Sequence, residues 1–200
     1  MKPEDSSKAL FFLRESIVNR DWNEIRKNLI IILRLLPYRE SLRVTLDQVG
    51  RQLPNFECNY ANHSGPRDIL EQLKVKVNSD LPITNFPLAS PDLDKDYASP
   101  GDNSFIAAIN YAVDSINHYD SDRSVDFLAD AIENAIMSEL DRVWGEKNLK
   151  DWNAWYHHNN SPDASKPNLY RLGMMDDPRV INVEQKIWMS LYDKLCLLLE

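Results

Sequence analysis

The chain has 200 residues, 43% of them hydrophobic, and a formal net charge of −8 at pH 7. A chain of this length and composition can bury a hydrophobic core without metal or disulfide cross-links, which predicts one globular domain, 1–200. The negative charge argues against nucleic acid as a partner, because binding to a phosphate backbone depends on Lys and Arg side chains.

The sequence shows no signal peptide and no membrane-spanning segment. The first ten residues, MKPEDSSKAL, are polar, and the longest early apolar run, LIIILRLL at 29–36, is interrupted by Arg34. The two cysteines, Cys58 and Cys196, are far apart and provide no disulfide framework. These features predict a cytoplasmic protein that does not contact a membrane.

Apolar residues recur at helical spacing in the first half, and they predict four helices whose apolar positions lie at 10–17, 25–36, 42–49 and 69–73. Ser6 or Ser7 is placed to cap the first of these helices. Asp21 and Glu24 form a capping box for the second, and Pro37 suits the first residue of the third. The first-half helices therefore span residues 6–76.

Three stretches of this half do not follow the helical pattern. Gly50 and Pro54 are stop signals, and residues 55–65 are predicted to be loop. KVKV at 74–77 alternates like a strand, although no second strand is available to pair with it. Residues 78–103 contain four prolines and no sustained period, which predicts one long irregular loop.

The second half predicts four more helices within residues 104–199, with apolar positions at 105–116, 125–143, 149–156 and 183–195. Residues suited to capping precede the first two: Asp102, Asn103 or Ser104, and then Ser121 or Asp122. Residues 159–177 are predicted to be loop, and Pro178 to begin the last helix. The predicted fold is all-α, with about eight helices.

No motif in the sequence identifies a reaction or a cofactor. It has no CxxC or HExxH metal motif, no glycine-rich phosphate loop and no GxSxG nucleophile elbow. The adjacent His157 and His158 would point about 100° apart on a helix, so they would not bind one ion together. We therefore predict no metal site, no cofactor and no catalytic residue.

The stretch DWNAWYHHNN at 151–160 places three large aromatic side chains on one helical face, at positions i, i+3 and i+4: Trp152, Trp155 and Tyr156. Packing against a neighbouring helix explains such a face. The functional alternative is an aromatic anchor for a protein partner. We include the three residues among the candidate partner-binding residues.

The negative charge is concentrated in one part of the chain, residues 92–141, which we call the acidic segment. It holds 12 acidic side chains against Lys95 and Arg123, whereas residues 1–91 hold 13 basic and 11 acidic side chains. Solvated helix faces explain part of this pattern. A concentrated negative surface would also attract a basic protein. The candidate acidic surface comprises Asp92, Asp94, Asp96, Asp102, Asp120, Asp122, Asp126, Asp130 and Glu133.

Three of these residues form what we call the acidic row: Asp126, Asp130 and Glu133, at i, i+4 and i+7 of the predicted helix over 122–143. Because the apolar positions of that helix face inward, the row is predicted to face outward and to lack neutralising partners. The arginines of the first half, among them Arg26 and Arg34, are predicted to lie on ordinary solvated helix faces.

The stretch FIAAINYAVDSINHYDSDRSVDFLADAIENAI at 105–136 resembles the helical immunity proteins of bacterial toxin systems, in particular contact-dependent growth inhibition. The resemblance covers residues 104–144. It implies a protein that binds the toxic C-terminal domain of a secreted effector, commonly a nuclease, and blocks its active site. That family carries no catalytic residues to transfer, so the candidate residues rest on charge and aromatic character.

Three functional hypotheses follow. The first is a non-enzymatic immunity protein that neutralises a basic toxin or nuclease through the acidic surface. The second is an enzyme with a deep polar pocket near the 78–103 loop and carboxyl groups of perturbed pKa. The third is an oligomer that associates through the apolar tail LCLLL at 195–199.

Overall fold

The structure is a computed structural model that describes residues 3–79, 99–148 and 173–199. Within these ranges it contains eight α-helices and no strand, so the all-α prediction is confirmed. The helices are α1 (Pro3–Asn19), α2 (Trp22–Leu35), α3 (Tyr38–Gly50), α4 (Leu53–Asn59), α5 (Gly65–Asn78), α6 (Asp102–Asn117), α7 (Ser124–Gly145) and α10 (Pro178–Leu199).

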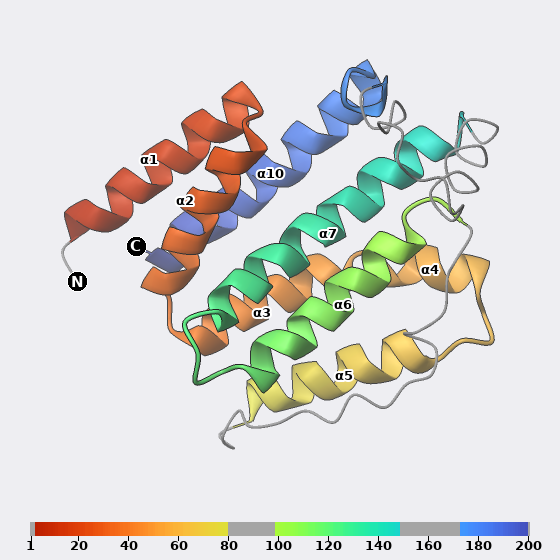
Figure 1. The fold of residues 1–200 in the computed structure, drawn as a ribbon, viewed down its shortest axis with the longest axis horizontal. Helices are drawn as coiled ribbons and strands as arrows, with labels where there is room; N and C mark the ends of the chain where they lie inside the picture. Colours follow the sequence, from red (N-terminus) through yellow and green to blue (C-terminus); the bar gives the residue numbers. More distant parts are fainter. Residues whose placement is uncertain (1–2, 80–98, 149–172, 200) are drawn as a thin grey trace, which may run out of the picture.

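Helix α7 lies at the centre of the bundle (Figure 1). It forms a hairpin with α6 and also packs against α2, α3 and α10. Leucine and isoleucine side chains of α7 are fully buried, and alanines at 129, 131 and 135 let neighbouring helices approach closely. The apolar surface of α7 is therefore broader than the single stripe predicted from the sequence, because α7 has neighbours on several sides.

Helices α1, α2 and α10 pack together along one side of α7 (Figure 1). At the α1–α2 turn Arg20 adopts a positive φ of 55°, and its Nη2 donates hydrogen bonds to Glu184 Oε2 and to the Met175 carbonyl oxygen, both at 2.7 Å. Behind this turn the Trp22 and Trp188 rings meet edge to face, with centroids 5.5 Å apart. This contact connects the α1–α2 hairpin to the last helix.

The predicted starts of the first three helices are partly confirmed. The Asp21 side chain accepts a hydrogen bond from the Glu24 N–H at 3.1 Å, so the predicted cap of α2 is present. Helix α1 begins at Pro3, ahead of the predicted serine caps. Pro37 is the N-cap residue of α3, with an extended ψ of 137°, and not its first helical residue.

The prediction of a loop at 55–65 is wrong for residues 55–59, which belong to α4. Pro54 lies in the first turn of α4, where its missing N–H leaves no intrahelical bond unmade. The helix is held by Phe56, which is buried against Phe105 with ring centroids 5.4 Å apart. The strand alternative for KVKV is also wrong, because residues 74–77 form the last turn of α5 and Val77 is buried.

The predicted side-chain caps of α6 and α7 are wrong. The N-cap residue of α6 is Gly101, with a φ of 85°, and that of α7 is Arg123, whose side chain makes no capping bond. A Cβ at position 101 would lie 2.1 Å from the Ser138 carbonyl oxygen. Close packing of the 99–101 segment on α7 therefore decides where α6 begins.

Several predictions lie outside the described residues, among them the helix over 149–156 and most of the loops at 78–103 and 159–177. The last helix begins at Pro178 as predicted. The eight helices of the described ranges include α4, which the sequence did not predict, whereas the predicted helix over 149–156 lies outside these ranges. In the described ranges, no helix combines the length and the apolar character needed to cross a bilayer.

Candidate functional site

Six of the twelve candidate partner-binding residues lie outside the described residues: Asp92, Asp94, Asp96, Trp152, Trp155 and Tyr156. The other six occupy three different settings in the fold. The acidic row lies along α7 beside α2, Asp102 is in the interior, and Asp120 and Asp122 are in the turn between α6 and α7.

The acidic row does not lack neutralising partners, so that prediction is wrong. Arg26 Nη2 lies 2.5 Å from Asp130 Oδ1, and Arg26 Nε lies 3.5 Å from Glu133 Oε2. Arg34 Nη2 lies 3.3 Å from Asp126 Oδ1. Because α2 runs antiparallel to α7, arginines two turns apart on α2 meet carboxylates along α7. The α2 arginines are therefore not part of an ordinary solvated face.

Glu133 is the least neutralised member of the acidic row. Burial raises its pKa to about 7, while Arg26 lowers the pKa and the neighbouring Asp130 raises it further. Although Arg26 and Glu133 are within ion-pair distance, Arg26 makes its short contact with Asp130. One guanidinium group is therefore shared by two carboxylates. Burial raises the pKa of Glu133 by more than the nearby Arg26 lowers it.

Asp102 was predicted to belong to the acidic surface, and this prediction is wrong because the residue is only 4% exposed. Its Oδ2 accepts a hydrogen bond from Asn59 Nδ2 at 3.2 Å. Burial raises the pKa of this carboxyl group to about 6, and hydrogen bonds from Asn59, Ser99 and Tyr60 lower it. Its contacts link α4 and the 99–101 segment to the start of α6.

Asp120 and Asp122 are exposed, as predicted. Within the described residues neither carboxylate makes an ion pair. They border a cavity of about 430 Å³, which we call the turn pocket and which is lined by Leu33, Arg34, Leu36, Tyr38, Tyr119, Asp120, Ser121, Asp122, Ser124 and Val125. The pocket combines an apolar floor from α2 and α7, two tyrosines and two carboxylates.

The sequence interpretation did not identify Tyr38, Tyr119 or Ser124 as functional residues. Tyr119 could have been noticed, since it stands directly before Asp120 in an otherwise polar turn. Tyr38 and Ser124 come from the starts of α3 and α7. Only the packing of these helices brings the two residues to one cavity, so no local signal marks them.

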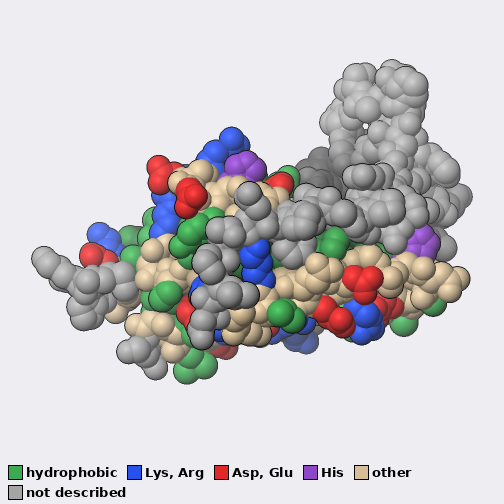
Figure 2. Space-filling view, turned by 90° about the horizontal axis from the view of Figure 1, so that it is seen from below, with side chains coloured by type: hydrophobic (Ala, Val, Ile, Leu, Met, Phe, Trp, Pro, Cys, Tyr) green, Lys and Arg blue, Asp and Glu red, His purple; other side chains and the backbone are tan. Residues whose placement is uncertain are grey.

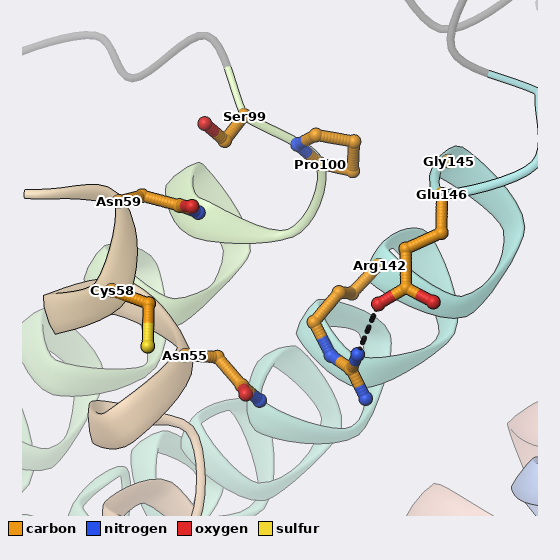
Figure 3. A pocket seen from close by; sticks show the side chains of 8 residues that line it. All are labelled: Asn55, Cys58, Asn59, Ser99, Pro100, Arg142, Gly145 and Glu146. Carbon is orange, nitrogen blue, oxygen red and sulfur yellow. Dashed lines mark hydrogen bonds and ion pairs between the residues drawn. The ribbon is translucent and has the colours of Figure 1, made fainter.

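A second cavity, of about 330 Å³, lies between α4 and the end of α7, and we call it the α4–α7 pocket (Figure 3). Its lining residues are Asn55, Cys58, Asn59, Ser99, Pro100, Arg142, Gly145 and Glu146. Arg142 forms ion pairs with Glu139 and Glu146. The Arg142 charge is thereby neutralised, and the pocket presents mainly amide, thiol and hydroxyl groups.

Charge is mixed on the face of the molecule seen in Figure 2, where acidic and basic side chains alternate. Among the described residues, no three His, Cys, Asp or Glu side chains are grouped so as to hold a metal ion. Comparisons with protein-family models, curated proteins and solved structures found no match. The function must therefore be inferred from the geometry of the two pockets and of the acidic residues.

Proposed function

We propose that this protein is a non-enzymatic binding protein of the immunity type, which acts in the cytoplasm by binding a basic toxin or nuclease domain and blocking it. The observation that carries the proposal is that two carboxylates bordering the turn pocket, Asp120 and Asp122, make no ion pair within the part of the chain that the structure describes. These two charges are available to a partner, whereas those of the acidic row are held by α2.

The charge arrangement favours an approach of the partner toward the α6–α7 turn. Opposite charges on two proteins raise the rate of association, and the effect decreases with salt. The α2 arginines cancel much of the field of the acidic row, so the turn becomes the most attractive part of the described acidic segment. A basic nuclease would present there the same side chains that hold its phosphate substrate.

The test is a rescue by co-expression. The 3′ end of the gene directly upstream is expressed in a laboratory bacterium, with and without this protein. We expect growth arrest that the wild-type protein relieves. A protein with Asp120→Lys and Asp122→Lys should relieve it poorly. The matched control carries Asp176→Lys and Asp193→Lys, two exposed charges on or beside α10, and should rescue fully.

Two outcomes would contradict the proposal. If the upstream product does not arrest growth, no toxin–antidote pair is encoded there. If the Asp120→Lys, Asp122→Lys protein is folded and rescues as well as the control, the turn is not the binding surface. Circular dichroism of each variant provides the check on folding.

A second candidate function, an enzyme, is favoured by the α4–α7 pocket. Two residues of the 78–103 segment, Ser99 and Pro100, form part of its wall, and Asn59 connects it to the Asp102 carboxyl group, whose pKa is raised. A thermal-shift screen of polar metabolites tests this function. A hit that Asn59→Ala abolishes, in a stable variant, would support it over the immunity proposal.

The oligomer hypothesis concerned the tail at 195–199. Leu195 is buried in the core, whereas Leu197 is 75% exposed. The tail thus contributes to the core of the chain and leaves two apolar side chains, Leu197 and Leu198, exposed. Sedimentation at high protein concentration tests the hypothesis, and a monomer would exclude it.

A further inference from the structure

We propose that the turn pocket receives an arginine side chain of the partner, which stacks on the Tyr119 ring and forms ion pairs with Asp120 and Asp122. This inference rests on the proposed function and specifies the chemical group that the partner presents. It concerns a pocket whose lining residues come from α2, α3 and α7, from Leu36 just after α2, and from the turn that joins α6 to α7.

The aromatic wall of the pocket is fixed by the core. The Tyr38 hydroxyl group forms a 2.6 Å hydrogen bond with Ser115 Oγ, and burial raises the Tyr38 pKa to about 12, so this hydroxyl stays protonated at neutral pH. The Tyr38 ring meets the Tyr119 ring edge to face, with centroids 4.8 Å apart. Tyr119 is thereby positioned while 46% of it remains exposed, which leaves ring surface for a cation.

Ser124 gives independent evidence that the pocket binds a polar group. This residue lines the pocket and is only 5% exposed. In the described part of the chain its hydroxyl group makes no hydrogen bond, although its backbone N–H donates to the Ser121 carbonyl oxygen at 3.1 Å. Its Oγ atom is not sealed from solvent, so a donor from a ligand in the pocket can take the place of water there.

A guanidinium group fits these features better than an ammonium group. It is planar, so it can stack on a tyrosine ring, and its five N–H donors can reach two carboxylates and a serine hydroxyl together. The apolar floor formed by Leu33, Leu36 and Val125 can pack against the methylene groups of the same side chain. A lysine would supply one point charge without the planar face.

The arginines already near the pocket do not fill this role. Arg34 lines one side, but its Nη2 is directed to Asp126 Oδ1 at 3.3 Å and to the Asp122 carbonyl oxygen at 3.4 Å. The Arg123 guanidinium lies over the Phe127 ring, 5.6 Å from its centroid. The Asp120 and Asp122 carboxylates are left for a cation from outside, and Arg34 restricts that cation to their side of the pocket.

The test is an NMR titration of the full chain, ¹⁵N-labelled, with N-acetyl-arginine methylamide. We expect saturable shifts at residues 119–124. The corresponding citrulline derivative, which is neutral and has nearly the same shape, should cause none, and the lysine derivative should bind more weakly. Asp120→Asn with Asp122→Asn should weaken arginine binding about tenfold, and Tyr119→Ala about fivefold. The control Asp176→Asn, at the start of the α10 region, should bind like wild type.

Equal shifts with the citrulline and arginine derivatives, or no shifts at 119–124 with either, would overturn the inference. Preserved binding in a folded Asp120→Asn, Asp122→Asn protein would do the same. The co-expression rescue is read separately. Rescue without arginine binding means that the immunity function stands and the arginine pocket is wrong. Arginine binding without rescue means that the pocket is a cation site and the immunity function is wrong.

Discussion

The described acidic segment contains two contrasting regions, the middle of α7 and the α6–α7 turn. In the first, three carboxylates lie beside two arginines of α2, and the short Arg26–Asp130 contact is 2.5 Å. In the second, Asp120 and Asp122 are exposed and make no ion pair within the described residues. Residues of equal charge thus occupy two settings, one beside the arginines of α2 and one exposed to solvent.

This difference shows that charge along the sequence is a poor guide to charge on the surface. The acidic row is the acidic feature that the sequence marks most clearly, yet its carboxylates face the arginines of α2 where α2 packs on α7. The turn residues are less regular in sequence, and they border a cavity. Four predictions test this contrast, ordered by the size of the expected effect on stability.

The largest loss of stability is expected for Arg26→Glu. The new carboxylate would face Asp130 and Glu133 where a guanidinium now stands, so an attraction becomes a repulsion. We expect a decrease in the free energy of unfolding of about 3 kcal/mol, measured by urea denaturation. The control is Lys186→Glu, a charge reversal at an exposed position of α10. It should change the free energy of unfolding by less than about 0.5 kcal/mol. Similar values for both variants would show that the α2–α7 ion pairs contribute little.

The second prediction concerns Glu133→Gln and pH. The pKa of Glu133 is about 7 in the folded protein and 4.5 in the reference state, so folding disfavours its charged form. Ionisation of Glu133 therefore destabilises the wild type fully above about pH 7 and not at all below about pH 4.5. The Gln variant should be more stable than wild type at pH 8, on the order of 2 kcal/mol after allowance for solvent screening.

At pH 4.5 the advantage of Glu133→Gln should disappear, which a denaturation series across this range will show. Asp102, with a pKa of about 6, also titrates in this range. Because it is present in both proteins, its contribution cancels in the difference between their free energies of unfolding. A variant that is less stable than wild type at pH 8 would show that the ion pair with Arg26 outweighs the effect of burial.

A smaller effect is expected for Arg34→Ala, because its contact with Asp126 is longer and more exposed. We expect a loss of about 0.5 kcal/mol in the free energy of unfolding. The same change removes a positive charge from the side of the turn pocket, so N-acetyl-arginine methylamide should bind about twofold more tightly. Weaker binding would mean that Arg34 helps to form the site.

The smallest effect on stability is expected for Asp120→Asn with Asp122→Asn. Both residues are exposed and unpaired in the described structure, so the free energy of unfolding should stay within about 0.5 kcal/mol of wild type. Thermal and urea denaturation provide the measurement. A large loss would place these two carboxylates in the same stabilising role as the acidic row and remove the contrast between the two regions.

The sequence predicted features that depend on residues close together in the chain. Periodic apolar residues indicated an all-α fold, the Asp21–Glu24 spacing gave the cap of α2, and Pro178 gave the start of the last helix. The sequence prediction failed at α4, because Pro54 was interpreted as a signal that ends the preceding helix. Helix α4 depends on Phe56 packing against Phe105, which lies on α6. The candidate site was predicted in part, since Asp120 and Asp122 are exposed but Asp102 is buried.

The sequence by itself determined most of the helical segments, α4 excepted, because helix periodicity and capping involve residues within about one turn of each other. The tertiary structure decided which charges remain free, because Arg26 and Asp130 are 104 positions apart and meet only when α2 packs on α7. It also created the turn pocket, whose tyrosines belong to the start of α3 and to the α6–α7 turn. Charge neutralisation and cavity formation depend on distances in space, which residue spacing along the chain does not specify.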